Sequence, residues 1–153
     1  MITDRTYEDV TAAKALRARG LPFTEIEKTQ LERGTVTVNT LNRIESAMAS
    51  LPALWAASGY PCPAVATNTW TNAGYFRKSD FETLIANAKT LRAALIAYST
   101  TPTEVLPLYH FAEWNKLEQI VGDLVEIGTY IKDNALKCGT FRSGARRMLP
   151  IKR

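Results

Sequence analysis

The residues best suited to metal or acid–base chemistry stand at positions 110 and 113. His110 and Glu113 are three residues apart, a spacing that places two ligands on one face of a helix. His110 is the only histidine, and no further ligand follows at short spacing. Cys62 and Cys138 are far apart and suit neither a zinc cage nor a redox motif, so we expect free thiols. We predict no metal site and no cofactor.

The acidic residues towards the end of the chain do not form a catalytic pattern. Asp123, Glu126 and Asp133 follow a spacing that is typical of the solvated face of a helix. The sequence also has no glycine-rich phosphate loop, no nucleophile elbow and no kinase signature. Ser143 lies in a basic tail without an activating partner. These patterns predict that the protein is not an enzyme.

The end of the chain is the strongest candidate for an interaction site. Residues 134–153 carry six cations and no acid, whereas residues 1–133 carry 13 cations and 15 acids. Such an asymmetry is typical of an interaction arm. The arm, residues 140–153, alternates cations with apolar side chains, and its candidate contact residues are Phe141, Arg142, Arg146, Arg147, Met148 and Leu149.

Three interpretations of the arm remain open. Binding to nucleic acid needs cations but no apolar residues. Because Phe141, Met148 and Leu149 alternate with the cations, we favour docking of the arm on another protein over binding to nucleic acid. The third possibility is a frayed terminus without function.

A second candidate surface lies in the segment 59–78, which has no helical periodicity. Trp70, Tyr75 and Phe76 stand there among Asn, Thr and Gly residues. Aromatic side chains in an irregular loop are often interface anchors, but they cap a core as often, and the sequence leaves both interpretations open.

These sites require a helical scaffold, and apolar spacing predicts one. Two short helices are expected after Thr6 and Thr24, each with a capping box. The first should end near Gly20 and the second near Gly34. In the second helix we expect Ile26 and Leu31 to face inward. We expect 35–38 to be an edge strand or a linker. A third helix, capped by Asn39 and Thr40, carries an apolar stripe and a kink or break at Pro52. Its stripe is Leu41, Ile44, Met48, Leu51 and Trp55.

The fourth and fifth predicted helices complete the bundle. The fourth begins at Ser79, with Glu82 completing the cap, and its inward face extends to Tyr98. The last runs from about Phe111 to Leu136, with Trp114 in the core and Gly122 and Gly128 permitting close packing. The predicted fold class is therefore mainly α, a small bundle of three longer helices plus short N-terminal helices over residues 1–139, with an extended C-terminal arm at 140–153.

Composition sets broad limits on the class of protein. The chain has 153 residues, of which 46% are hydrophobic and 22% charged, which suits one globular domain. No apolar stretch approaches the roughly 20 residues that span a bilayer, so we expect no membrane insertion. The polar, acidic start is unlike a secretory signal, and we expect an intracellular origin.

Several motifs, taken in order, carry a resemblance to a known group of proteins. The chain resembles small proteins encoded in the tail-gene modules of phages and prophages of Gram-positive bacteria. The likeness covers most of the chain and rests on Asp4-Arg5-Thr6-x-x-Asp9-Val10, Asn39-Thr40-Leu41-Asn42-Arg43-Ile44-Glu45, Trp70, Thr101-Pro102, Asn115-x-x-Glu118 and Gly139-x-Phe141-x-Ser143-Gly144. The chain departs from the pattern at Ala145-Arg146-Arg147, where an acidic residue is expected after Ser-Gly.

The resemblance implies a virion structural protein of the distal tail, the baseplate or a fibre-attachment site. Its partners would be other tail or baseplate proteins and further copies of itself, with assembly in the host cytoplasm. The alternative is a small nucleic-acid-binding or regulatory protein that uses the basic tail.

Overall fold

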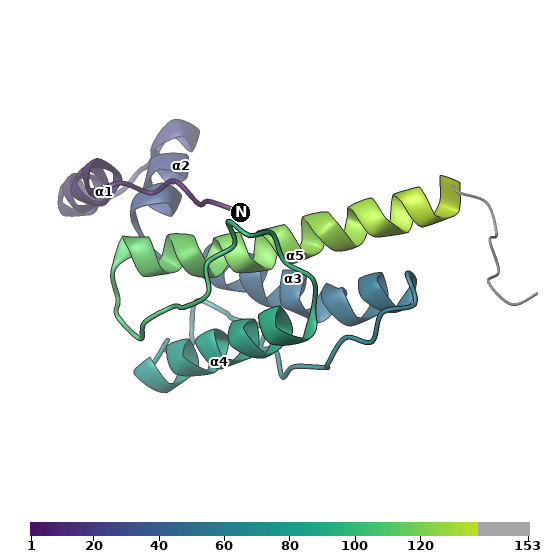
Figure 1. The fold of residues 1–153 in the computed structure, drawn as a ribbon. Helices are drawn as coiled ribbons and strands as arrows, with labels where there is room; N and C mark the ends of the chain where they lie inside the picture. The colour runs from purple at the N-terminus through teal and green to yellow at the C-terminus, as the bar shows by residue number, and fades with distance from the viewer. Residues whose placement is uncertain (138–153) are drawn as a thin grey trace, which may run out of the picture.

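The protein is built from helices in the part of the chain that the computed structural model describes, residues 1–137. Within that range there are five helices and no strand: α1 (Tyr7–Arg19), α2 (Glu25–Gly34), α3 (Val38–Ala56), α4 (Lys78–Ala94) and α5 (Phe111–Lys137). Helices α3 and α4 pack on α5, and α1 packs on α2 at the end of the molecule where α5 begins (Figure 1). The predicted bundle of three longer and two short helices is confirmed.

The predicted apolar stripes form one core between α3, α4 and α5. All five residues of the α3 stripe are buried, as are the inward residues of α5 from Trp114 to Ile127. Trp55 lies in this core and its Nε1 donates to the carbonyl oxygen of Leu124 at 3.1 Å. Gly128 of α5 leaves space for two side chains of α3, because a Cβ there would lie 2.8 Å from Trp55 Nε1 and 2.9 Å from Leu54 Cδ2.

The helix caps explain where each element begins. Thr6 and Thr24 form the predicted capping boxes with Asp9 and Glu27. The predicted caps of the next two helices are wrong by two to three residues. Helix α3 begins earlier because Thr37 Oγ1 accepts from the N–H of Thr40. Helix α4 begins at Lys78 because the carboxylate of Asp80, rather than that of Glu82, reaches back to the N–H of Arg77.

The structure also decides between alternatives that the sequence left open for α3 and the segment before it. Of the kink or break predicted at Pro52, the break does not occur, because α3 continues to Ala56. The β-branched segment before it is a linker in which Thr35 caps α2 and Thr37 caps α3, so no edge strand forms there.

Two residues predicted to face inward are exposed. Ile26 has 82% of its surface exposed because α2 packs on α1 and this side chain lies on its outer side. Tyr98 is 42% exposed because α4 ends at Ala94, before the predicted helical face reaches it. The Arg92 guanidinium holds the connector at the end of α4 by donating to the carbonyl oxygens of Thr101 and Pro102.

The contact between α1 and α2 depends on a glycine in the last turn of α2. A Cβ at Gly34 would overlap the carbonyl oxygen of Asp9 and lie 2.5 Å from Cβ of Ala13. Arg33 reinforces the contact through its ion pair with Asp9, 3.3 Å long. Backbone approach, rather than a large apolar interface, therefore joins the two short helices.

Gly34→Ala is expected to destabilise the protein by about 2 kcal/mol, because the added methyl must push α1 away from α2. Urea unfolding followed by circular dichroism measures the change. Gly122→Ala is the matched control, since a Cβ there meets only the flexible side chain of Met1 at 3.3 Å. Helix propensity favours alanine at both sites. Equal effects of the two substitutions would contradict the close-approach argument.

Candidate partner-binding site

The N-terminal segment is fixed against α5 by a buried carboxylate. Glu118 is fully buried and accepts from the Arg5 guanidinium at 2.5 Å, from the Ile2 N–H at 2.6 Å and from Arg43 at 3.1 Å. Arg43 also lies 3.6 Å from Glu32 of α2. One side chain of α5 therefore connects the N-terminal segment, α3 and, through Arg43, α2.

The residue one turn earlier on α5 holds the backbone of the same segment. Asn115 Oδ1 accepts from the Arg5 N–H at 3.2 Å, and Asn115 Nδ2 donates to the Arg5 carbonyl oxygen at 3.0 Å. The segment runs antiparallel to the first turns of α5 (Figure 1). Asn115 and Glu118 thus hold both the backbone and the side chain of Arg5.

The same pair of residue types holds the loop after α3. Asn42 Oδ1 accepts from the Trp70 N–H at 2.7 Å, and its Nδ2 donates to the Trp70 carbonyl oxygen at 3.0 Å. Trp70 Nε1 donates to Glu45 Oε1 at 3.3 Å. We call each arrangement an Asn-x-x-Glu clamp. In both, residues three apart on one helix face bind the backbone and side chain of one residue in an extended segment.

The structure separates the three aromatic residues predicted as partner-binding in this loop. Trp70 is clamped, and both Trp70 and Phe76 are partly buried against the core. Phe76 lies 5.3 Å from the Trp70 ring and 5.9 Å from Trp114. Tyr75 is 87% exposed and remains available to a partner. For Trp70 and Phe76 the core-capping interpretation fits the geometry. The predicted arm residues lie outside the described part of the chain.

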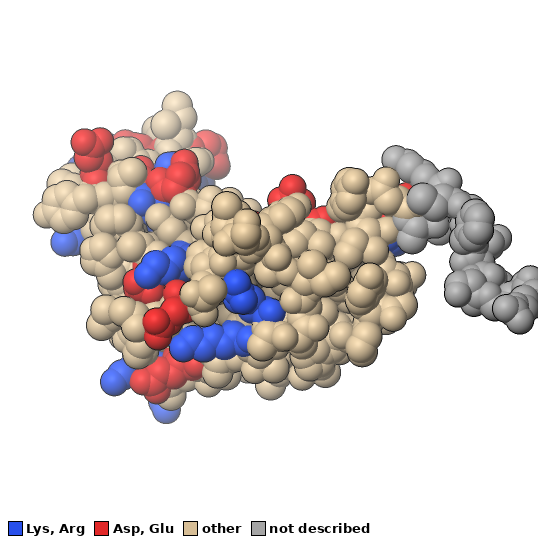
Figure 2. All heavy atoms as spheres, in the orientation of Figure 1, with Lys and Arg blue, Asp and Glu red and all other residues tan. Residues whose placement is uncertain are grey.

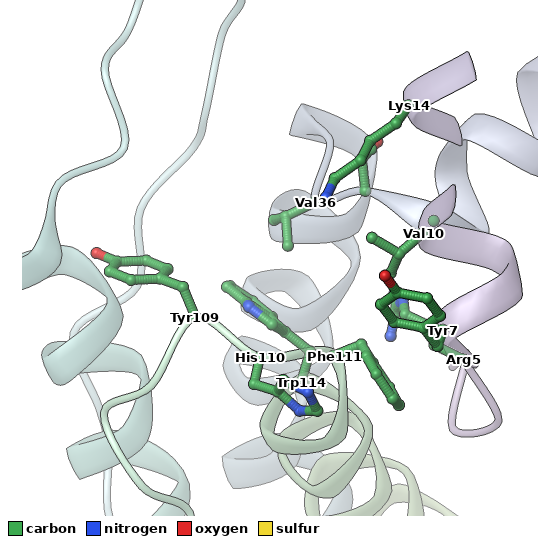
Figure 3. Close-up of a pocket in the computed structure, with 11 residues that line it drawn as sticks. Arg5, Tyr7, Val10, Lys14, Val36, Tyr109, His110, Phe111 and Trp114 are labelled. Atoms are coloured by element: carbon green, nitrogen blue, oxygen red, sulfur yellow. The ribbon is translucent and has the colours of Figure 1, made fainter. Parts of the chain in front are cut away.

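An open cleft lies between α1 and the start of α5, and the sequence analysis did not identify it (Figure 3). Its volume is about 340 Å³, at the lower end of the range of ligand pockets. The residues around it come from three separate stretches of the chain, 5–14, 34–36 and 109–114, so no local motif could have revealed it. The lining residues are Arg5, Tyr7, Val10, Lys14, Gly34, Thr35, Val36, Tyr109, His110, Phe111 and Trp114.

Packing fixes the wall of the cleft that belongs to α5. Tyr109, just before α5, and Trp114 of α5 both stack on the Phe81 ring of α4, with ring centroids 5.1 Å and 4.5 Å from it, and the four rings of Phe76, Phe81, Tyr109 and Trp114 form an aromatic cluster. Across the cleft Tyr7 is 71% exposed, and Tyr109 is 57% exposed despite its stacking. The cleft therefore has an aromatic wall that is packed against α4, and the exposed rings of Tyr7 and Tyr109 lie on opposite sides of it (Figure 3).

His110 and Glu113, whose spacing on the helix would suit two metal ligands, are used in local hydrogen bonds. His110 Nδ1 accepts from the N–H of Ala112 at 3.3 Å. The Glu113 carboxylate accepts from Lys116 and from the Leu106 N–H, both at 2.8 Å. Burial alone raises the pKa of Glu113, but these hydrogen bonds outweigh it and hold the pKa below its ordinary value. Residues 1–137 contain no group of three His, Cys, Asp or Glu side chains placed to bind a metal.

The described surface has no large region of one charge on the face in Figure 2. Basic and acidic side chains alternate over the end of the molecule that carries α1, α2 and the start of α5, and the rest of this face is mostly uncharged.

Asp123, expected on a solvated face, is partly buried and accepts from Thr101 Oγ1. Among the helices up to residue 137, none combines the length and apolar character of a membrane span.

Comparison of the chain with known proteins found no matching protein family, no matching curated protein and no matching solved structure.

Glu118→Gln is expected to destabilise the protein by about 3 kcal/mol, because two arginines lose the charge that compensates them in a buried site. Urea unfolding at pH 7 gives the free-energy difference. Glu82→Gln is the control, because Glu82 pairs with Lys78 on the surface of α4 and such pairs contribute little. A loss at Glu118 no larger than at Glu82 would contradict the role of the buried carboxylate.

Glu45→Gln, in the other clamp, is expected to stabilise the protein at pH 7 rather than destabilise it. Burial raises the pKa of the Glu45 carboxyl, and the hydrogen bond from Trp70 only partly offsets this. A carboxyl whose pKa is higher in the folded protein than in the unfolded chain stabilises the fold at pH values below its unfolded-state pKa. This stabilisation is lost as the pH rises through the pKa of the folded state. At pH 7 the glutamine variant should therefore be more stable than the natural protein, and the difference should shrink towards pH 4. Thermal unfolding at both pH values measures it; lower stability of the variant at pH 7 would refute the argument.

Proposed function

We propose that this protein is a structural component of a phage or prophage tail that acts by docking on other proteins. The observation that supports the proposal most is the open cleft beside the start of α5, where exposed Tyr7 and Tyr109 surround an apolar interior. Aromatic residues at the edge of a desolvated pocket are typical of protein interfaces.

The way the body is held together also supports a docking role. Glu118 fixes the N-terminal segment, which leads directly into α1, and the aromatic cluster fixes the opposite wall of the cleft. A partner would therefore meet a surface whose shape is set before binding, which reduces the entropy lost on association.

The motifs that carry the resemblance to phage tail proteins have a structural role in this chain. Arg5, Asn42, Glu45, Asn115 and Glu118 belong to them, and all five take part in the two Asn-x-x-Glu clamps together with Trp70. On this proposal the motifs maintain the shape of the docking body, and the arm after residue 139 contacts neighbouring subunits or tail proteins.

Truncation after Gly139 tests the proposal. We expect the truncated chain to fold, with the helical circular dichroism of the full chain, but to fail in restoring tailed particles when supplied to a phage or prophage that lacks its own copy. Electron microscopy and particle counts provide the measurement. Normal particle assembly by the truncated chain would contradict a docking role for the arm.

Two full-length variants separate protein docking from binding to nucleic acid. One replaces Phe141, Met148 and Leu149 by Ser, and the other replaces Arg142, Arg146 and Arg147 by Gln. Docking on protein predicts that the first variant loses assembly. The nucleic-acid alternative predicts that the first variant keeps its function, whereas the second loses a DNA affinity that falls steeply with added salt.

A further inference from the structure

Apolar side chains from three stretches of the chain line the interior of the cleft. Val10 of α1 and Val36 of the linker face Phe111 and Trp114 of α5 across it (Figure 3). All four side chains are at least partly buried. The cleft volume of about 340 Å³ leaves room between them for one more apolar side chain.

The charged groups around the cleft are all basic. Its lining contains Arg5, Lys14 and His110 but no Asp or Glu. Arg5 is already paired with Glu118, although its buried Nε has no hydrogen-bond partner within residues 1–137. Lys14 forms no ion pair in the same range, and its side chain extends from α1 towards Val36 (Figure 3). A carboxylate entering the cleft would therefore find Lys14 uncompensated by an acid.

The position of the cleft adds to this preference for negative charge. It lies at the N-terminal end of α5, a helix of 27 residues whose dipole presents its positive end there. His110 accepts from the Ala112 N–H through Nδ1, which leaves Nε2 as the ring donor when the imidazole is neutral. Charge and hydrogen-bond donors thus favour an anionic group beside the apolar interior.

We infer that the cleft binds an acidic segment of a partner protein, with an aromatic or branched aliphatic side chain between Val36 and Phe111 and a neighbouring carboxylate on Lys14. This inference rests on the proposed docking function and names the chemistry of the partner. A protein segment fits better than a small molecule because the exposed rings of Tyr7 and Tyr109 extend the apolar surface beyond the cavity itself.

Selection of peptides on the full chain tests the inference. A phage-displayed library of random 12-residue peptides is panned against the full-length protein, and the selected peptides are synthesised and titrated by fluorescence anisotropy. We expect enrichment of Asp or Glu next to Phe, Trp, Leu or Ile. Lys14→Glu should weaken binding about tenfold, because a rim charge then repels the peptide carboxylate. Lys89→Glu on the exposed side of α4 makes the same charge change and should leave affinity unaltered.

A second variant fills the cleft. Val36→Phe should abolish binding of the selected peptides, and its circular dichroism melting curve shows whether the fold is intact; if it is not, Lys14→Glu decides the test. Recovery of no acidic peptide, or equal affinity for the Lys14 and Lys89 variants, would overturn the inference. So would tight binding of indole-3-acetate alone or of a dT10 oligonucleotide at the Lys14-dependent site. Because the peptide measurements need no phage particles, they can contradict the inference about the cleft while the assembly experiment supports the proposed docking function. The opposite combination of results is also possible.

Discussion

The burial of one carboxylate constrains the architecture of this protein more than any other contact. Glu118 lies inside the molecule and requires partners for its charge, which it obtains from the Arg5 guanidinium, the Arg43 guanidinium and the Ile2 N–H. These contacts bring together the first residues of the chain, the second turn of α3 and the first half of α5. The position of α1 follows, because α1 begins two residues after Arg5. The cleft between α1 and α5 is therefore a consequence of the way that Glu118 is neutralised.

The two Asn-x-x-Glu clamps solve the same problem at two places. A segment without regular secondary structure leaves backbone groups that need hydrogen bonds when it is partly buried. In each clamp an asparagine side chain provides both a donor and an acceptor for one residue, and the glutamate binds that residue's side chain. The clamps differ in electrostatics, since the guanidinium of Arg5 compensates Glu118 but the neutral indole of Trp70 does not compensate Glu45. The same Asn-x-x-Glu spacing thus binds a charged side chain, Arg5, in one clamp and a neutral side chain, Trp70, in the other.

The helices and the core could be predicted from the sequence because their signals are local. Apolar residues three and four apart identified the buried faces of α3, α4 and α5, and the capping boxes located α1 and α2. The start of α4 was missed because Ser79-x-x-Glu82 and Arg77-x-x-Asp80 compete within two residues. The cleft and the pairing of Arg5 with Glu118 could not be predicted, because they join residues more than 100 positions apart. Periodicity reports which face of a helix is buried but does not identify what covers it.

Helix α5 also sets a length scale for anything built from this protein. Its 27 residues extend about 40 Å at 1.5 Å per residue, and the cleft lies beside the first turn whereas Lys137 ends the last. The number of helical turns in α5 therefore determines the distance between molecules that are attached at its two ends. An insertion of about seven residues, close to two turns, would move them about 10 Å further apart and rotate them by about 20° about the helix axis.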